Sequence, residues 1–314
     1  MVWRATPIDF GKDIDPGTLN GKSVLITGGT EGIGYDIARG AARHGAYVTI
    51  TARNKERGLR RQNELVSDGL KAQFVEADVS DWNSQLGAFK AAVAFSPTAR
   101  LDVVIVNAGL YGSAPFADLL NATDTEDPAP PSTAVLDVNL KGAYYTTALA
   151  LHFFKRTSRP NDSAKKQLLF IGSIAGYLTQ SLLTDYAASK YGVRAIWKSL
   201  RFQDEALGFG FRTNLVAPGF IDTPLVTPQM TQELQKMGCP IGTVDEVTAA
   251  VVRLLADESI DGRAVAVAKG AIWDLEDDLA GGDAAKTLHN PEALYKLGGP
   301  AGKLIVSYND YFDD

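Results

Sequence analysis

Short β-branched segments alternate with longer amphipathic segments along most of this chain, and this alternation limits the possible folds more than any other feature. SVLITG (23–28) has the apolar character of a buried strand, and GIGYDIARGAARHG (32–45) follows it with helical spacing. LDVVIVNAG (101–109) is almost continuously apolar, as expected of a strand covered on both faces. The βαβα order predicts an α/β fold, with a doubly wound parallel sheet, helices on both faces and right-handed crossovers.

The same rhythm continues to about residue 268, without an internal repeat. Further strands are expected at 47–53, 72–78, 167–173, 211–219 and 262–268, the last of these being the final strand. Further helices are expected at 55–69, 82–95, 130–156, 185–208 and 244–259. We predict one catalytic domain over residues 1–280, with a short N-terminal extension at 1–20, followed by a C-terminal extension at 281–314.

Composition argues against several classes of function. The 314 residues are 45% hydrophobic and 22% charged, as in a soluble globular protein. A net charge of −6 without a long basic run argues against nucleic acid or a membrane as a partner. No signal-peptide core or apolar stretch of about 18 residues occurs, so we expect a cytoplasmic protein. Cys239 is the only cysteine, and with no His/Cys cluster we predict no metal site.

The segment TGGTEGIG (27–34) follows the first predicted strand and opens the first predicted helix. Its glycines, Gly28, Gly32 and Gly34, would let the backbone turn tightly and approach a diphosphate. The helix N-terminus behind them would offer N–H donors and the positive end of a dipole. A plain strand-to-helix turn is the alternative, but this context favours a diphosphate-binding loop.

A tyrosine and a lysine lie one helical turn apart in DYAASKYG (185–192). On a helix, Tyr186 and Lys190 share a face. An ammonium group near a phenol favours the phenolate and lowers a pKa that is ordinarily about 10. These eight residues alone do not distinguish a tuned acid/base from two ordinary helix residues.

With TGGTEGIG, NAG (107–109) and YAASK (186–190) in this order, residues 20–270 resemble the short-chain dehydrogenase/reductase family. The resemblance implies a single Rossmann-type domain. It also implies an oxidoreductase that transfers a hydride between a nicotinamide cofactor and a carbonyl or secondary alcohol of a small-molecule substrate. Four catalytic residues follow from the family pattern: Asn139, Ser173, Tyr186 and Lys190.

The family pattern gives each of these residues a role. Tyr186 exchanges a proton with the substrate oxygen, and Lys190 stabilises its phenolate and binds the nicotinamide ribose. Ser173 polarises the substrate oxygen. Asn139 kinks its helix and anchors a water that links Lys190 to solvent. The alternatives are a helix-capping role for Ser173 and a structural amide for Asn139.

The resemblance also implies the cofactor contacts. The expected residues are Gly28, Thr30, Gly32, Ile33, Gly34, Arg53, Asp78, Val79, Asn107, Gly109, Tyr186, Lys190, Pro218, Gly219, Ile221 and Thr223. In the family, the pair equivalent to Asp78 and Val79 contacts the adenine. Asn107 has either a structural or a cofactor-binding role.

The end of the second strand favours NADP(H) over NAD(H). Folds that prefer NAD usually place an acidic residue there to bind the ribose hydroxyls, whereas this chain has Ala52 followed by Arg53. An arginine can bind a 2′-phosphate through two hydrogen bonds. Glu31 argues the other way unless it pairs with Arg53, because that position is often basic in NADP-preferring relatives.

Two other functions remain to be weighed. A hydrolase would need GxSxG, whereas Ser173 lies in GSIAG (172–176). An NAD(P)-binding protein of the same fold without redox turnover, such as a sensor, scaffold or non-redox cyclase, is the main alternative, because fold does not determine function.

The expected substrate pocket is apolar. Its candidate residues are Leu110, Tyr111, Tyr177, Leu178, Leu182, Leu183, Phe220 and Leu225, which favour a hydrophobic or aromatic substrate. We expect 222–243 to form a substrate lid. The helices around 134–155 and 185–207 resemble those through which family members assemble, which predicts a homodimer or homotetramer.

Overall fold

The computed structural model describes residues 8–112, 116, 127, 129–159, 164–177, 183–201, 203–236 and 238–275. Its centre is an eight-stranded sheet in the order β3-β2-β1-β4-β5-β6-β7-β8, parallel except for the last pair. The strands are β1 (Ser23–Thr27), β2 (Tyr47–Ala52), β3 (Ala72–Glu76), β4 (Val103–Val106), β5 (Lys166–Ile171), β6 (Phe211–Pro218), β7 (Ala264–Ala268) and β8 (Ala271–Asp274). The predicted doubly wound α/β fold is confirmed.

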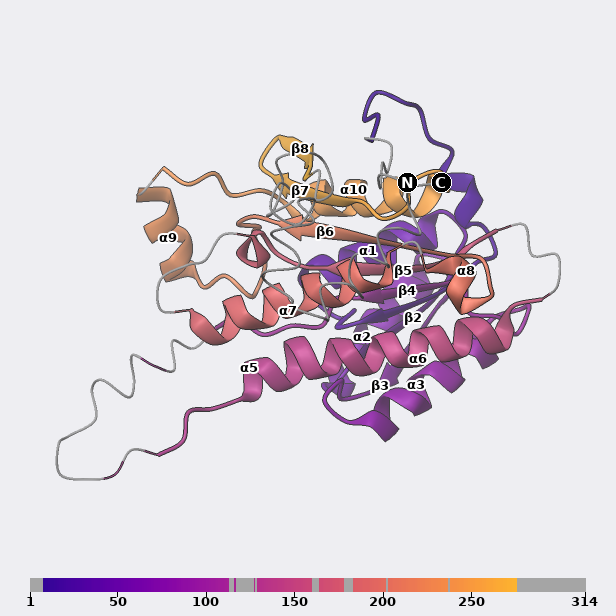
Figure 1. Ribbon diagram of the computed structural model, residues 1–314, viewed down its shortest axis with the longest axis horizontal. Coiled ribbons are helices and arrows are strands. Elements are labelled where there is room, and N and C mark those ends of the chain that lie inside the picture. Colours follow the sequence, from indigo (N-terminus) through magenta and orange to yellow (C-terminus); the bar gives the residue numbers. More distant parts are fainter. Residues whose placement is uncertain are drawn as a thin grey trace, which may run out of the picture.

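Helices cover both faces of this sheet, as Figure 1 shows. The longer helices are α1 (Gly32–Arg43), α2 (Lys55–Ser67), α3 (Trp82–Phe95), α6 (Gly142–Thr157), α7 (Thr184–Leu200), α9 (Pro228–Lys236) and α10 (Val244–Ala256). The short ones are η1 (Pro16–Leu19), α5 (Ala134–Leu136), η2 (Asp137–Lys141), η3 (Ile174–Gly176) and α8 (Asp204–Leu207). Apolar residues of α1, α2 and α10 pack on one face of the sheet, and those of α3, α6 and α7 pack on the other.

The prediction that 262–268 is the final strand is wrong, because β8 pairs antiparallel with β7 at the edge of the sheet. A buried ion pair between Arg263 and Asp274 joins the two strands, and the Arg263 Nε lies 3.0 Å from the Asp274 carboxylate. The same carboxylate accepts a hydrogen bond of 3.0 Å from the Ile8 backbone N–H. Asp274 therefore fixes both the added strand and the beginning of the described chain.

The single helix predicted at 185–208 is also wrong, because α7 ends at Leu200 and α8 begins at Asp204. The residue between them that caps α7 is Arg201, whose ψ of 138° is extended and cannot continue a helix. Its guanidinium lies over the ring of Trp197 at 4.7 Å. Packing of this arginine on the fully buried tryptophan thus accompanies the end of the helix.

Helix α9 lies within the expected lid segment 222–243. The predicted extension at 281–314 lies outside the described residues, so the division of the chain at residue 280 stays a prediction. In the part of the chain that the structure describes, none of the helices has the length and hydrophobicity needed to span a membrane.

A buried arginine satisfies the C-terminus of α10. Arg212, on β6, is 1% exposed, and its guanidinium donates to the backbone carbonyls of Leu254 and Leu255 at 2.7 Å each. It also donates to the carbonyls of Asp257 and Ile260 at 3.1 Å each. Burial lowers the pKa of Arg212 to about 10, so the side chain stays charged at neutral pH. The cation lies at the negative end of the helix dipole. It also donates hydrogen bonds to carbonyls that have no donor within the helix.

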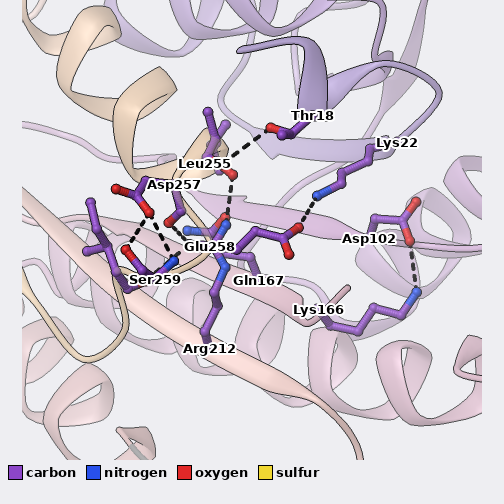
Figure 2. Close-up of polar contacts among 12 residues, drawn as sticks. Thr18, Lys22, Asp102, Lys166, Gln167, Arg212, Leu255, Asp257, Glu258 and Ser259 are labelled. Atoms are coloured by element: carbon purple, nitrogen blue, oxygen red, sulfur yellow. Dashed lines mark hydrogen bonds and ion pairs between the residues drawn. The ribbon is translucent and has the colours of Figure 1, made fainter. Parts of the chain in front are cut away.

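Figure 2 shows the Arg212 side chain reaching this end of α10. Two further ion pairs lie in the same view: Lys22 with Glu258 at 2.9 Å, and Lys166 with Asp102 at 2.8 Å. The Lys166 side chain is only 2% exposed, so its pair with Asp102 compensates for a buried charge.

We expect Arg212→Met to lower the free energy of unfolding by about 3 kcal/mol or more, because several carbonyls would lose their donor together. Urea denaturation of the wild type and the variant measures this loss. Arg60→Met, at an exposed arginine on α2, is the control and should change stability by less than about 0.5 kcal/mol. Equal stability of the two variants would contradict the capping role of Arg212.

Candidate active site

A cavity of about 570 Å³ opens at the carboxyl ends of the parallel strands. Strand β1 lies between β2 and β4, so the strand order reverses there, where open α/β sheets bind ligands. Three of the four predicted catalytic residues and every predicted cofactor contact line this cavity: Gly28, Thr30, Gly32, Ile33, Gly34, Arg53, Asp78, Val79, Asn107, Gly109, Ser173, Tyr186, Lys190, Pro218, Gly219, Ile221 and Thr223. The fourth catalytic candidate, Asn139, lies behind the wall.

The glycine-rich loop passes very close to the segment that follows β4. Gly28 has a φ of +66°, and a Cβ there would lie 2.8 Å from the Ala108 Cα. The Asn107 side-chain amide donates to the carbonyls of Thr27 and Gly28 at 2.9 and 3.1 Å. Asn107 thus ties the ends of β1 and β4 together, which is the structural one of its two predicted roles, while it also lines the cavity.

The N-terminus of α1 fits an anionic group. Glu31 occupies the N-cap position, but its side chain accepts no hydrogen bond from the first turn. The helix therefore retains first-turn N–H groups without a side-chain cap beside the cavity wall formed by Gly32 and Ile33. With Arg53 and Lys190 in the same lining, these donors suit a dinucleotide diphosphate and its riboses.

Asp78 lies on the wall near the end of β3. Its carboxylate accepts hydrogen bonds from the backbone N–H and the hydroxyl of Ser80, at 2.8 and 2.7 Å. Burial by itself would raise the pKa of Asp78, but the Ser80 hydrogen bonds and the charge of Arg53 outweigh it, so the pKa is lowered. Asp78 is accordingly an ionised acceptor facing the cavity.

Tyr186 and Lys190 lie at the other end of the cavity, one turn apart on α7, and are 8% and 7% exposed. The Lys190 Nζ lies 5.5 Å from the centroid of the Tyr186 ring and donates to the Ile171 carbonyl at 3.3 Å. Burial lowers the pKa of Lys190 to about 8.

Burial also raises the pKa of Tyr186, against the opposing effect of a hydrogen bond with Ser173. The expectation that Lys190 brings this pKa below its ordinary value is therefore wrong, because burial disfavours the phenolate by more than the Ser173 hydrogen bond favours it. The same cause acts on both groups: a site shielded from water disfavours the charged form of each.

Ser173 has the helix-capping role that the sequence left open, and its role toward a substrate oxygen stays a prediction. Its hydroxyl accepts from the Ala175 N–H at 3.1 Å and so caps the short helix η3. The same hydroxyl forms the hydrogen bond that opposes the rise in the Tyr186 pKa. The cap fixes the side chain beside the phenol, where both line the cavity.

Asn139 is buried within η2, a π-helical turn between α5 and α6. Its amide donates to the Leu110 carbonyl at 2.9 Å and to the Ser189 hydroxyl at 3.1 Å, and its oxygen accepts from the Leu110 N–H at 2.7 Å. The Ser189 hydroxyl donates in turn to the Tyr186 carbonyl at 2.7 Å. The Asn139 side chain thus joins the loop after β4 to the helix that carries Tyr186, and the predicted water link to Lys190 stays a prediction.

The predicted substrate residues divide into three groups. Leu110, Tyr111, Phe220 and Leu225 line the cavity. Leu183 and Tyr177 pack in neighbouring hydrophobic clusters instead. Leu178 and Leu182 lie outside the described residues.

Tyr111 lies against Tyr186, with ring centroids 5.3 Å apart and planes inclined by 41°. Burial, and then the neighbouring Tyr186, raise the pKa of Tyr111. Tyr111 is thus a neutral, aromatic and partly polar wall next to the candidate acid/base.

Sequence reasoning missed two residues that shape this site. Ser189 lies inside the YAASK motif, but its contact with Asn139 spans 50 positions and leaves no local pattern. Arg57 lines the cavity from the first turn of α2, and no local sequence pattern distinguishes it from the other arginines of that helix. Glu31 pairs with Arg57, so the pair with Arg53 that would have removed the objection to a phosphate is not the one formed.

We expect Lys190→Met to stabilise the fold at neutral pH. The folded-state pKa of about 8 is below the ordinary lysine value of about 10.4, so between these values the unfolded chain binds more protons and stability rises with pH. Below about pH 8 Lys190 is charged in the folded protein, and the full free-energy cost of burying that charge is present. Removing the amine should add about 2 kcal/mol at pH 7, after about 1 kcal/mol is lost because the Ile171 carbonyl loses its donor.

Urea denaturation of the wild type and Lys190→Met at pH 7 and pH 10 tests this prediction. The difference between the two proteins should shrink at pH 10, because the wild-type penalty is then largely relieved. Lys90→Met, at an exposed lysine on α3, is the matched control. A variant less stable than the wild type at pH 7 would refute the burial penalty.

Comparison with known proteins places this cavity in a family. The family described as short chain dehydrogenase matches residues 22–234. A 5′-hydroxyaverantin dehydrogenase from Dothistroma septosporum is 35% identical over 298 residues, which cover 88% of this chain and 94% of the relative. An NADP-dependent dehydrogenase from Phoma sp. is 36% identical over 304 residues, which cover 90% of this chain and 86% of the relative.

A solved structure has the same architecture. The crystal structure of a 3-ketoacyl-(acyl-carrier-protein) reductase from Brucella melitensis, complexed with NADH, matches with a TM-score of 0.67 and 26% identity. The match covers 80% of this chain and 98% of that chain. The family match extends over the glycine-rich loop, the NAG segment and the Tyr186–Lys190 pair. The chain therefore belongs to the short-chain dehydrogenase family and is an oxidoreductase that acts on alcohol groups.

Proposed function

We propose that this protein transfers a hydride between NADP(H) and the carbonyl or secondary alcohol group of a hydrophobic or aromatic substrate. One observation carries the proposal. Ser173, Tyr186 and Lys190 line one end of the same cavity whose other end is lined by the glycine-rich loop and Arg53. A substrate oxygen and a dinucleotide can therefore share one enclosed site.

Each residue near the substrate oxygen has a chemical task in this proposal. A bound nicotinamide would supply the hydride-transfer chemistry. The Tyr186 hydroxyl gives a proton to the substrate oxygen in reduction and accepts it in oxidation, a contribution of about 10²- to 10⁴-fold in rate. The Ser173 hydroxyl donates to the same oxygen as negative charge develops there. The Lys190 ammonium, 5.5 Å from the phenol ring, stabilises the phenolate.

The choice of NADP(H) rests on charge at the end of β2. Arg53 lines the cavity and is exposed, and Ala52 stands where folds that prefer NAD usually have a carboxylate to bind the ribose hydroxyls. The relative from Phoma sp. is named as NADP-dependent, which supports this choice, although the structurally similar reductase is complexed with NADH.

The substrate class rests on the wall around Tyr186. Leu110, Tyr111, Phe220 and Leu225 give this end of the cavity an apolar and aromatic surface. Burying apolar substrate area against such a surface favours binding, and Tyr111 adds a face on which an aromatic ring can stack. The expected lid contributes Leu225 and Val226 to the same lining.

We expect Tyr186→Phe to lower kcat by at least about 10²-fold while the dissociation constant of NADP⁺ stays largely unchanged, because the phenol acts on the substrate proton. Nicotinamide absorbance with a panel of aromatic ketones measures turnover, and calorimetry measures binding. Tyr191→Phe is the control, since this exposed hydroxyl on the same helix donates to the Tyr177 carbonyl.

The same experiment separates redox catalysis from cofactor binding alone. Wild-type protein that binds NADP⁺ but oxidises and reduces no member of the panel would favour the alternative of a sensor, scaffold or non-redox cyclase. A Tyr186→Phe variant with near wild-type kcat would exclude Tyr186 as the acid/base.

A homo-oligomer through α6 and α7 is part of the proposal. Tyr144 on α6 and Tyr191 on α7 are 62% and 39% exposed, which supports an aromatic contact surface on these helices. A cytoplasmic location likewise remains a prediction.

We expect Tyr144→Glu to shift the protein toward the monomer, because a carboxylate would be desolvated at the contact. Light scattering coupled to size-exclusion chromatography measures the mass. An unchanged mass would argue against this surface.

A further inference from the structure

Two arginines and two carboxylates line the cavity where it runs past the ends of β2 and β3. Ala52, Arg53 and Arg57 line it from β2 and α2, and Glu31 lines it from the glycine-rich loop. Arg53 is exposed, and the structure gives it no hydrogen-bond or ion-pair partner among the described residues. Its charge acts on Asp78, whose pKa it helps to lower.

Arg57 is held differently. Its Nη1 donates to the Glu31 carboxylate at 2.5 Å, and the two side chains are 32% and 40% exposed. Glu31 lies at the N-cap of α1, yet its carboxylate turns to Arg57 and does not cap the helix. The Arg57 Nε is buried without an acceptor among the described residues, so the guanidinium keeps unused hydrogen-bonding capacity.

The beginning of α2 is fixed against the same loop at a second point. Arg61, one turn after Arg57, donates from Nε to the Thr30 carbonyl at 3.2 Å. Its guanidinium pairs with Glu64 at 2.7 Å and lies 4.4 Å from the centroid of the Tyr35 ring. These contacts join α2 to the loop and to α1, next to the pair that Arg57 forms with Glu31.

The charges at this end of the cavity are not balanced for a phosphate. Arg53 and Arg57 carry two positive charges, and the carboxylates of Glu31 and Asp78 carry two negative charges in the same lining, whereas a phosphate monoester carries about −1.5 to −2 at neutral pH. The Glu31 carboxylate competes with such a phosphate for Arg57 and repels it. Because the pair is partly exposed, water and salt weaken it, and a dianion can displace the carboxylate.

We propose that Arg57 is a second determinant of the preference for a 2′-phosphate, and that Glu31 limits this preference by occupying Arg57 when no phosphate is bound. The proposal rests on the proposed use of NADP(H) and adds two residues to it. It predicts opposite effects of two substitutions at contacting residues. Glu31→Gln strengthens binding of a 2′-phosphate, and Arg57→Met weakens it.

The probes for this test are 2′,5′-ADP and 5′-AMP, which differ by the 2′-phosphate, with NADP⁺ and NAD⁺ as the complete dinucleotides. Isothermal titration calorimetry measures their dissociation constants without turnover. Arg57→Met should weaken 2′,5′-ADP by about tenfold, through loss of a charged hydrogen bond and exposure of Glu31. Glu31→Gln should tighten it about threefold, and neither change should alter 5′-AMP binding by more than about twofold.

The double variant and two further variants sharpen the result. Arg57→Met with Glu31→Gln should recover part of the loss of Arg57→Met alone, because the unpaired carboxylate is removed as well. Arg57→Lys, which keeps the charge but not the planar fork, should fall between the wild type and Arg57→Met. Arg60→Met, at an exposed arginine outside the cavity lining, should change neither probe.

The outcomes separate this inference from the proposed function. Wild-type protein that binds 2′,5′-ADP no more tightly than 5′-AMP would overturn the use of NADP(H) itself. Wild-type discrimination that is lost in Arg53→Met but unchanged in both Arg57→Met and Glu31→Gln would overturn the inference alone. A weaker affinity of Glu31→Gln for 2′,5′-ADP would also overturn it, because Glu31 would then be supporting the site.

Discussion

The close approach of the chain after β1 to the chain after β4 is the constraint on which the site depends. Gly28 has a left-handed φ of +66° and no room for a Cβ, which would lie 2.8 Å from the Ala108 Cα. Asn107 closes this contact with two hydrogen bonds to the carbonyls of Thr27 and Gly28. The floor of the cavity is consequently built from backbone held between two central strands. Side chains that enter from α2, η3 and α7 then meet over a fixed surface.

Positioning in this site is achieved by groups that do not face the cavity. Asn139 lies behind the wall and connects the Leu110 backbone to Ser189, one residue before Lys190. The π-helical turn that carries Asn139 places an extra residue in the helix and allows the amide to reach both partners. Ser173 is likewise held by the cap of η3 before it meets Tyr186. Short capped or π-helical turns thus position the residues that we propose to be catalytic.

Much of this arrangement could be predicted from sequence, and the exceptions have a common physical origin. Strands buried on both faces leave continuous apolar runs, so all strands but β8 were recognised near their observed bounds. Motif order placed Ser173, Tyr186 and Lys190 together. The four residues of β8 carry no such signal, because the strand is fixed by Arg263 and Asp274, whose contact is tertiary.

Charged pairs and pKa shifts also depend on tertiary contacts that the sequence does not reveal. Glu31 and Arg57 are 26 positions apart, and only the packing of α2 on the glycine-rich loop reveals which arginine takes the carboxylate. Burial likewise reversed the expected pKa shift of Tyr186, because the sequence identifies neighbours but not their exclusion from water.

The two ends of the cavity therefore use charge in different ways. At the end that carries the proposed catalytic residues, Lys190 is 7% exposed and burial lowers its pKa to about 8, so its charge is costly and little screened. At the other end, Glu31 and Arg57 are partly exposed and paired, so each contributes little and salt weakens the pair. On the proposed roles, a substitution at Lys190 changes both stability and catalysis, whereas one at Glu31 or Arg57 changes the affinity for a 2′-phosphate. This asymmetry would let the proposed preference between dinucleotides be adjusted while the acid/base pair stays fixed.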